Sequence, residues 1–440
     1  MKVLLLDFNI DATVGLHQGL MSLSASLKKN HHEVRLLLLN DKIGTCFNLE
    51  KIEHIVTEYG PDIIGISIVE TQLNYIKKFC NYFSHYYIIC GGPYVTINPY
   101  TTLRIKGVNS VCIGEGEEAF CELCNGKKRP LNILSDNHHK ISLRPFNSLK
   151  NIPPPDYNLF DLDSLLPIKN NQLEVMIGRG CTGKCSYCIN DSYLKKYKGF
   201  CTIPPKPKDY IRYRNADEII EELVSLKCSH NIEEIAFIDD NITGYPAKFL
   251  DNFFTSYKKK VTLPFTCNAS PLSINVARTT ILKNANCTTI RIGLESGSDR
   301  IKKEILNRPI SNKKIITASK VINDLDINLS TYNMIGLPLE SKEDIIETLK
   351  LNAYIKPKYV KLMIFYPFEC TPIYKKCEDL GLIDHEIKKG LTNYNSNTCI
   401  NFSPEHRKFI MDVQSNFDRY ISKFSNKNYS KITDSVAIRN

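Results

Sequence analysis

Three cysteines, Cys181, Cys185 and Cys188, lie close together in the chain, next to Gly180 and Gly183. Cysteine thiolates are the usual ligands of iron–sulfur clusters, and glycines let a backbone wrap around a cluster. A structural zinc ion would need four closed ligands, and no suitably spaced Cys or His pair follows closely. A redox dithiol would need only two cysteines. Three thiolates therefore predict a [4Fe–4S] cluster with one iron open to a further ligand.

Polar residues and glycines follow three apolar runs later in the chain. They are Asp239, Asp240 and Asn241 after the run 235–238, Glu295 and Ser296 after the run 289–294, and Gly336 after the run 329–335. Two carboxylates and an amide can hold an ammonium group, and a glycine lets a ligand approach the backbone closely. Each feature taken singly is equally compatible with an ordinary loop or a helix cap. Their recurrence after several strands favours a binding site.

The elements that position these residues alternate between short apolar runs and stretches of helical periodicity, such as residues 216–225 and 342–353. The predicted strands are Leu173 to Ile177, Ile235 to Ile238, Leu263 to Cys267, Thr289 to Leu294, Leu329 to Ile335 and Tyr359 to Phe365. Six such units predict a partial TIM-type (β/α)6 barrel, whose chemistry lies at the carboxyl ends of the strands. The three cysteines directly follow the first of these strands.

The first part of the chain shows the same alternation and predicts a doubly wound parallel sheet of the Rossmann-like α/β class. Its predicted strands are Val3 to Leu6, Val34 to Leu39, Ile63 to Ile68, Tyr87 to Cys90 and Val111 to Ile113. Turns rich in glycine follow the last two strands, with Gly91 and Gly92 in the first turn and Gly114, Glu115 and Gly116 in the second. Glycines at consecutive strand ends leave a crevice that admits a large ligand.

The proline-rich segment Ile152 to Asp156 separates the two series, because it cannot form a helix. We therefore expect an α/β domain at residues 1–140, a linker at 141–170, a barrel at 171–385 and a short helical C-terminal extension at 386–440. A proline-rich loop inside a single domain is the alternative.

The formal charge is +10, but the lysines are spread along the chain, and the densest run, Lys258 to Lys260, is short. A solvated surface explains this pattern, so we expect no nucleic-acid partner. No stretch approaches the roughly 18 apolar residues of a membrane-spanning helix, so we expect no membrane partner. The apolar start of the chain is too short for a signal peptide. The 16 cysteines then indicate thiols or metal ligands, and we expect a cytoplasmic protein.

The CxxxCxxC spacing with an aromatic residue before the third cysteine resembles the radical S-adenosylmethionine (SAM) superfamily. The resemblance implies that Cys181, Cys185 and Cys188 ligate the cluster and that the open iron binds the amino and carboxylate groups of SAM. Reduction by an external donor such as flavodoxin or ferredoxin would then give a 5′-deoxyadenosyl radical that abstracts hydrogen from a small-molecule substrate. The SAM-binding residues that the resemblance implies are Tyr187, Asp239, Asp240, Asn241, Glu295, Ser296 and Gly336.

Ser67 and the glycines after the neighbouring strands resemble the cobalamin-binding domain that precedes the barrel in one large branch of this superfamily. The residues that would hold cobalamin are Ser67, Gly91, Gly92, Gly114, Glu115 and Gly116. The Asp-x-His-x-x-Gly element that supplies a histidine to cobalt in other cobalamin proteins is absent, although Asp11, Gly15 and His17 lie nearby with a different spacing. We expect a cobalt ion without a histidine from the protein, and His17 as an ordinary loop residue.

The leading hypothesis is a cobalamin-dependent radical SAM enzyme, a methyltransferase acting on an unactivated carbon or phosphorus. Cyclisation, ring rearrangement and a first domain that no longer binds cobalamin are alternatives within the same family. A non-catalytic iron–sulfur electron carrier or sensor is the alternative from another class. Methylthiotransferases look similar, but their additional cluster cysteines are not clearly reproduced here. Among the remaining thiols, Cys121 and Cys124 are expected to pack inside a helix, and Cys370 to be a structural thiol.

Overall fold

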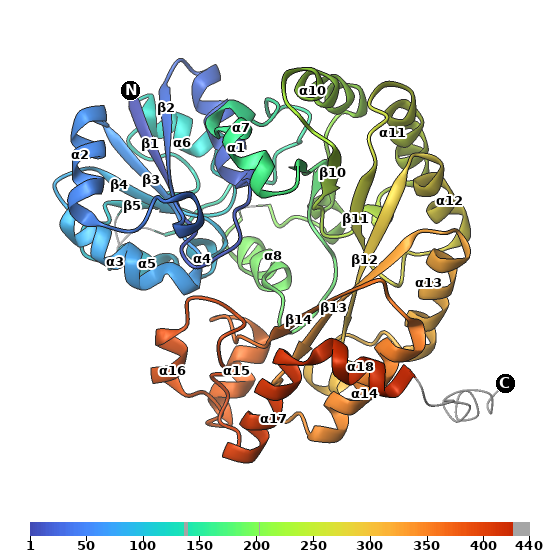
Figure 1. The fold of residues 1–440 in the computed structure, drawn as a ribbon. Coiled ribbons are helices and arrows are strands. Elements are labelled where there is room, and N and C mark those ends of the chain that lie inside the picture. Colours follow the sequence, from blue (N-terminus) through green and yellow to red (C-terminus); the bar gives the residue numbers. More distant parts are fainter. Residues whose placement is uncertain (136–139, 202, 426–440) are drawn as a thin grey trace. The chain divides into compact units, whose positions relative to one another are not determined.

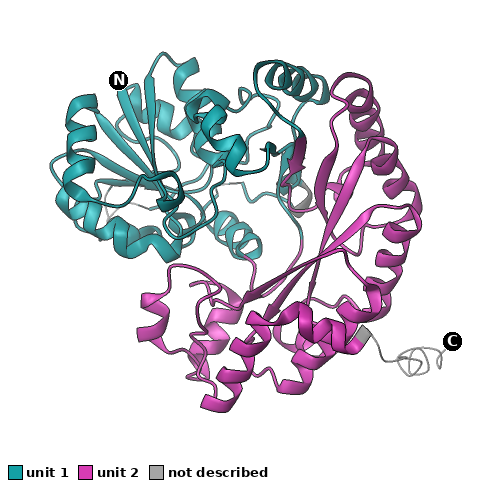
Figure 2. Ribbon diagram, viewed as in Figure 1, with its two compact units in different colours: residues 1–182, 189–233 teal, residues 183–188, 234–440 magenta. Residues whose placement is uncertain are grey.

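The computed structural model describes residues 1–135, 140–201 and 203–425. They form two compact units, which Figure 2 shows in different colours. The first unit comprises residues 1–182 and 189–233, and the second comprises residues 183–188 and 234–440. Parallel strands with intervening helices form the framework of both.

A parallel sheet lies at the centre of the first unit, with the strand order β2-β1-β3-β4-β5-β6 (Figure 1). Its strands are β1 (Lys2–Phe8), β2 (Glu33–Leu39), β3 (Ile63–Ser67), β4 (Ile88–Gly91), β5 (Ser110–Cys112) and β6 (Ile133–Leu134). All pairs are parallel except β5 with β6, which is antiparallel. The predicted doubly wound sheet is confirmed. The strand β6 escaped prediction because two residues show no periodicity.

The side chains of β1 alternate between two hydrophobic cores, one on each face of this sheet. The surrounding helices are α1 (Gln18–Lys29), α2 (Leu49–Tyr59), α3 (Leu73–Tyr82), α4 (Pro93–Ile97), α5 (Pro99–Leu103) and α6 (Glu117–Cys124). Leu4 and Leu6 pack with residues of α2 and α3, whereas Val3 and Leu5 pack with residues of α1 and α6. Burial on both faces explains why this strand is apolar throughout rather than alternating with polar residues.

The first unit continues beyond the proline-rich segment Ile152 to Asp156, which forms neither helix nor strand. Its later elements are α7 (Leu162–Ile168), β7 (Gln172–Val175), β8 (Gly178–Arg179), α8 (Ile189–Phe200), α9 (Pro207–Tyr210), β9 (Arg212–Tyr213) and α10 (Ala216–Ser229). The strands β8 and β9 pair antiparallel. Compactness groups these elements with the first sheet, while the domain limits at 140, 170 and 385 stay predictions.

The second unit contains five parallel strands, which are hydrogen-bonded in the order β14-β13-β12-β11-β10. Their bounds are β10 (Glu234–Phe237), β11 (Phe265–Ala269), β12 (Cys287–Glu295), β13 (Asn328–Ile335) and β14 (Tyr359–Ile364). The helices that alternate with them are α11 (Ala247–Lys260), α12 (Val276–Asn284), α13 (Asn312–Asp324) and α14 (Lys342–Ile355). Figure 1 shows these helices along the outer side of the curved strands. The predicted partial barrel is confirmed as a fold class.

Helices also form the C-terminal part of the second unit, namely α15 (Pro372–Asp379), α16 (His385–Gly390), α17 (Pro404–Ser415) and α18 (Phe417–Ser425). The single helical stretch expected at 404–424 is interrupted at Asn416, whose side-chain amide donates to the Asp412 carbonyl and carboxylate. Asparagine competes in this way with helical hydrogen bonding. The last residues of the expected extension, 426–440, lie outside the described residues. In the described ranges, none of the helices has both the length and the apolar character needed to span a membrane.

Candidate functional site

The three cysteines of the motif carry half-buried thiols. Cys181 belongs to the first unit, and Cys185 and Cys188 belong to the second. Gly180, which precedes Cys181, has a φ of +99°, and a Cβ at this position would overlap the Tyr210 carbonyl. Only glycine is compatible with both conditions. Among the described residues, no three His, Cys, Asp or Glu side chains are gathered as ligands of a single metal ion.

In the second unit, the segment around Cys185 and Cys188 is fixed by backbone contacts. Ser186 donates from its backbone N to the Leu306 carbonyl over 2.9 Å and from its hydroxyl to the Ile305 carbonyl over 2.6 Å. The Cys188 N–H donates to the Cys185 carbonyl over 3.1 Å and closes a turn between the two thiols. The spacing of these cysteines is therefore held by the chain that follows β12.

Charged and polar side chains from β12 and the loop after it surround this segment. Arg308 donates from Nη1 to the Sγ of Cys185 over 3.5 Å and from Nη2 to the Gly293 carbonyl over 2.8 Å. Tyr187 hydrogen-bonds to the carboxyl of Glu295. Burial raises the pKa of Glu295, against the opposing effect of Arg308 and of this hydrogen bond. These contacts bring Tyr187 and Glu295, both assigned to SAM from the sequence, close to one of the cysteines.

The backbone at the end of β12 places this carboxyl. The pairing of β12 with β13 shifts register between Gly293 and Glu295, and Glu295 has a φ of +66°. A left-handed conformation is costly for a residue with a side chain and persists only where the surrounding structure holds it. A Cβ on Gly293 would overlap the Glu295 carboxyl, so this glycine leaves room for it. The strand end is thus shaped around Glu295.

Arg308 is a site residue that the sequence did not reveal, because it lies beyond the π-helical turn Ile301–Ile305 that follows β12. Its Nε is buried and makes no hydrogen bond within the described part of the chain. A buried donor without a partner is rare in folded proteins. Arg308 gives this site a donor for a carboxylate, and Glu295 gives it an acceptor for a polar group. This donor set fits SAM beside a cluster held by the cysteines.

The residues after β10 divide into two groups. Asp239 is buried and accepts a hydrogen bond from the Tyr245 hydroxyl over 2.8 Å. Asn241 accepts from the Ser270 N–H over 2.9 Å and from the Ser273 hydroxyl over 2.9 Å. These two side chains hold the loops after β10 and β11, whereas Asp240 is exposed. The assignment of Asp239, Asp240 and Asn241 to SAM stays a prediction. Of the three, Asp240 has the carboxylate that such a ligand can reach.

Ser296 and Gly336 also make contacts within the second unit. The Ser296 hydroxyl is fully buried, hydrogen-bonds to the Thr348 hydroxyl over 3.4 Å and accepts from the Ser298 N–H. The Gly336 N–H donates to the carboxyl of Glu340 over 2.7 Å. Burial raises the pKa of this carboxyl to about 8. Glu340 therefore shapes the turn after β13, and the SAM role of Ser296 and Gly336 remains a prediction.

Three of the residues assigned to cobalamin meet at the carboxyl ends of β3 and β4. Gly92 has a φ of +98°, and a Cβ at this position would lie 2.9 Å from the Ser67 Oγ. The Gly91 carbonyl accepts from the Ile68 N–H over 2.9 Å, which ties the two strand ends together. Without side chains at 91 and 92, the backbone stays open to a large ligand. This edge fits the cobalamin that the sequence predicts to bind there.

His17 lies at the same edge, but both of its ring nitrogens have partners. Its Nδ1 accepts from the Leu20 N–H over 3.2 Å and caps α1, and its Nε2 lies 2.9 Å from the Ser67 Oγ. A neutral imidazole that accepts at Nδ1 carries its proton on Nε2. Neither nitrogen is then available to a metal, so His17 caps α1 in this structure, and a cobalt ion without a histidine from the protein stays a prediction.

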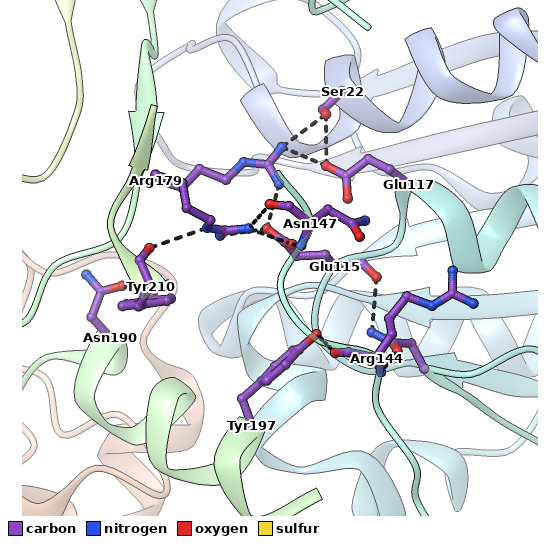
Figure 3. A network of polar contacts seen from close by, with 11 residues as sticks. Ser22, Glu115, Glu117, Arg144, Asn147, Arg179, Asn190, Tyr197 and Tyr210 are labelled. Carbon is purple, nitrogen blue, oxygen red and sulfur yellow. Dashed lines mark hydrogen bonds and ion pairs between the residues drawn. The ribbon is translucent and has the colours of Figure 1, made fainter. Parts of the chain in front are cut away.

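The remaining cobalamin candidates, Gly114, Glu115 and Gly116, pack against the protein itself. Glu115 is buried and forms ion pairs with Arg179 over 3.0 Å and with Arg212 over 2.8 Å. Figure 3 shows Glu115 within this polar network. A Cβ on Gly114 would overlap the Tyr197 ring. The structure thus gives the Glu115 side chain protein partners, and its assignment to cobalamin stays a prediction.

Three other thiols noted in the sequence behave differently from those of the motif. Cys121 and Cys124 are buried inside α6 as expected, and burial raises their pKa values to about 11 and about 12, respectively. They are protonated and unreactive at neutral pH. Cys370 is exposed, with a φ of +62°. The expectation of a structural thiol without a chemical role at Cys370 stays a prediction.

Two protein families match separate parts of the chain. The Radical SAM superfamily matches residues 175–351, and the B12 binding domain matches residues 12–124. The first range includes all three cysteines of the motif, and the second includes Ser67, Gly91 and Gly92. These matches confirm the predicted radical SAM enzyme with a [4Fe–4S] cluster, SAM and cobalamin as its cofactors.

Individual proteins resemble the chain over most of its length. An uncharacterised methyltransferase of Pyrococcus horikoshii is 24% identical over 379 residues, which cover 82% of this chain and 78% of that protein. The cytidylyl-2-hydroxyethylphosphonate methyltransferase of Streptomyces wedmorensis is 22% identical over 482 residues, which cover 89% and 86%. The solved structure of the cobalamin-dependent SAM radical enzyme OxsB, with aqua-cobalamin and SAM bound, matches with a TM-score of 0.71 at 16% identity, covering 94% of this chain and 67% of that one. At this level of identity, the similarity to OxsB shows a shared fold.

Proposed function

We propose that this chain is a cobalamin-dependent methyltransferase that acts on an unactivated carbon or phosphorus of a small molecule. It is a radical SAM protein in which a B12-binding domain precedes the radical SAM domain. The observation that carries the proposal is the presence of both domains in one chain. The two relatives that are named methyltransferases support methyl transfer as the reaction type.

We assign the three cysteines to the cluster, Tyr187, Glu295, Arg308 and Asp240 to SAM, and Ser67, Gly91 and Gly92 to cobalamin. When bound, the cluster and SAM supply a carbon radical, and cobalamin relays a methyl group. The chain binds and orients these groups. Arg308 contributes a positive charge beside the Cys185 thiolate, and Glu295 accepts a hydrogen bond from the polar part of SAM.

The electron for this reaction comes, in this proposal, from an external donor such as flavodoxin or ferredoxin. A reducing compartment such as the cytoplasm suits both that donor and the free thiols of the described residues. The proposal includes no nucleic-acid partner, because the basic residues are dispersed along the sequence.

The test uses the full chain, purified without oxygen and reconstituted with iron, sulfide and hydroxocobalamin. We expect corrin absorption bands, four irons per chain, 5′-deoxyadenosine after addition of SAM and dithionite, and transfer of labelled methyl from SAM to a substrate. Cys185→Ala should lose the cluster and keep the corrin bands. Cys228→Ala removes an exposed cysteine outside the motif and should behave like the unmodified protein.

Different results would support different alternatives. Absence of corrin bands after reconstitution would overturn the cobalamin assignment and leave a radical SAM enzyme with a vestigial first domain. An intact cluster that yields no 5′-deoxyadenosine would favour the electron carrier. Formation of 5′-deoxyadenosine with a corrin-bound enzyme and no methyl transfer to any product would favour cyclisation or rearrangement.

A further inference from the structure

Arg179 lies two residues before Cys181 and is bound to the loop that follows β5. Its Nη1 donates to Glu115 Oε1 over 3.0 Å, and its Nη2 donates to Glu117 Oε1 over 2.6 Å and to Ser22 Oγ over 3.0 Å. Figure 3 shows the guanidinium directed at these partners. The residue that leads into the cluster motif is thus held by a loop of the B12-binding domain.

Arg212 makes a second connection to the same loop. It pairs with Arg179 across the antiparallel strands β8 and β9, and its two terminal nitrogens donate to both oxygens of Glu115, each over 2.8 Å. The Asn147 N–H adds a further bond to Glu115 over 3.1 Å. Burial alone would raise the pKa of Glu115, but the two arginines outweigh it and lower the pKa. Glu115 is therefore a buried carboxylate whose two oxygens accept hydrogen bonds from groups of the protein.

A third connection comes from the chain after the motif. Tyr197 on α8 is fully buried in the core on one face of the first sheet. Its ring lies against Gly114, where a Cβ would overlap it, and its hydroxyl donates to the Arg144 carbonyl over 2.5 Å. Segments on both sides of the motif, β8 and α8, therefore contact the loop at residues 114–117.

These contacts fix the position of Cys181. Only Gly180 separates it from Arg179, and the Tyr210 carbonyl leaves no room for any other residue there. Moving Arg179 away from Glu115 and Glu117 would leave the buried Glu117 without its ion-pair partner and Glu115 with Arg212 alone, which is unfavourable. A shift of the loop at 114–117 therefore has to be accompanied by a shift of Arg179 and of the thiol beside it.

We propose that Arg179 is a positioning residue through which occupation of the B12-binding domain by cobalamin stabilises the iron site at Cys181. The inference rests on the proposed function, since it needs both cofactors. It gives Glu115 and Glu117 the role of holding Arg179, in place of contact with the corrin. Such coupling is reciprocal, so the cluster also strengthens cobalamin binding.

The experiment measures how fast reconstituted protein loses iron to a ferrous chelator, with and without bound hydroxocobalamin. The readout is the ratio of the two rates. In the unmodified chain, cobalamin should slow iron loss about fivefold or more, the lower end of typical coupling between sites. In Arg179→Met, both cofactors should still bind, but the ratio should fall to about one. A purely structural role for Arg179 would change both rates by the same factor and keep the ratio.

Arg144 provides the matched control. It forms ion pairs with Glu118 and Glu122 on α6, and Arg144→Met removes the same charge without touching β8, so its ratio should equal that of the unmodified chain. Arg179→Lys should recover part of the coupling. If Arg179→Met does not fold, Glu117→Gln removes the negative charge of one partner, keeps an oxygen acceptor for Arg179 and should give an intermediate ratio.

The outcomes separate two kinds of failure. A ratio near one in the unmodified chain, or an unchanged ratio in Arg179→Met and Glu117→Gln, would overturn the inference while leaving the proposed function intact. Absence of corrin bands in the unmodified chain would overturn the proposed function and this inference together.

Discussion

Arg308 donates a hydrogen bond to the Sγ of Cys185, a predicted cluster ligand, over 3.5 Å. Hydrogen bonds and positive charge near the sulfurs raise the reduction potential of an iron–sulfur cluster. Arg308→Gln should therefore lower the potential of the reconstituted cluster, on the order of 50 mV, close to the shift that a tenfold change in a one-electron equilibrium produces. An anaerobic redox titration followed by electron paramagnetic resonance measures it.

Arg300 offers the control for this experiment, because it pairs with Asp344 in the same unit. Arg300→Gln should leave the cluster potential unchanged. Equal potentials for Arg308→Gln and the unmodified protein would show that the contact with Cys185 is lost once iron is bound.

Gly92→Ala should weaken both folding and cobalamin binding. The backbone at Gly92 has a φ of +98°, and the added methyl group would lie 2.9 Å from Ser67 Oγ, so we expect a loss of about 1–3 kcal/mol. Thermal unfolding and a spectroscopic titration with hydroxocobalamin measure the two effects. Gly126→Ala is the control, since Gly126 has a φ of +84° with no atom near its added Cβ. If both variants lose cobalamin affinity equally, the Gly92 edge is not a binding surface.

Glu340→Gln should change how stability depends on pH. Burial raises the pKa of Glu340 from about 4.5 to about 8, so the folded protein holds a proton that the unfolded chain has lost over this range. The stability that this group contributes is complete below about pH 4.5 and disappears as the pH rises through about 8. Glutamine keeps the acceptor for the Gly336 N–H and cannot ionise. The free energy of urea unfolding should therefore change less between pH 6 and pH 9 for Glu340→Gln than for the unmodified protein. Each tenfold difference in proton affinity between the folded and unfolded chains corresponds to about 1.4 kcal/mol. Identical pH profiles for the two proteins would contradict the raised pKa.

Asp240→Asn should weaken SAM binding, because the Asp240 carboxylate is exposed after β10, where such a ligand can reach it. Loss of a charge-assisted hydrogen bond predicts an affinity about tenfold lower or more, which equilibrium dialysis with reconstituted protein measures. Asn241→Ala should instead lower the unfolding temperature, because its carbonyl oxygen joins the loops after β10 and β11. Unchanged SAM affinity in Asp240→Asn would remove Asp240 from the site.

His17→Ala should leave the spectrum of bound cob(II)alamin unchanged, because both ring nitrogens of His17 already have partners. Electron paramagnetic resonance should show no splitting by a protein nitrogen in either form. Loss of the cap of α1 should cost about 1 kcal/mol. A nitrogen splitting that disappears with His17 would identify it as a cobalt ligand.

The strands and the cysteine motif could be predicted because their signals are local. The apolar runs of β1, β3 and β12, and the spacing of the three thiols, each lie within a few neighbouring positions. Arg179 and Arg308 could not be predicted, because their partners are set by packing. Glu115 lies 64 residues before Arg179, and Cys185 lies 123 residues before Arg308. For the same reason, the sequence did not show that Glu115 and Asp239 have partners within the fold.

The register shift in β12 makes Glu295 unusually sensitive to insertion and deletion. Leu294 is the extra residue between Gly293, which pairs with Tyr332, and Glu295, which pairs with Asn333, so its removal would restore regular pairing and take away the left-handed backbone that directs the carboxyl. A deletion of one codon would then abolish the acceptor beside Tyr187 while leaving every side chain of the site in the sequence. Genes that encode this site are thus constrained in length at this strand as well as in residue type.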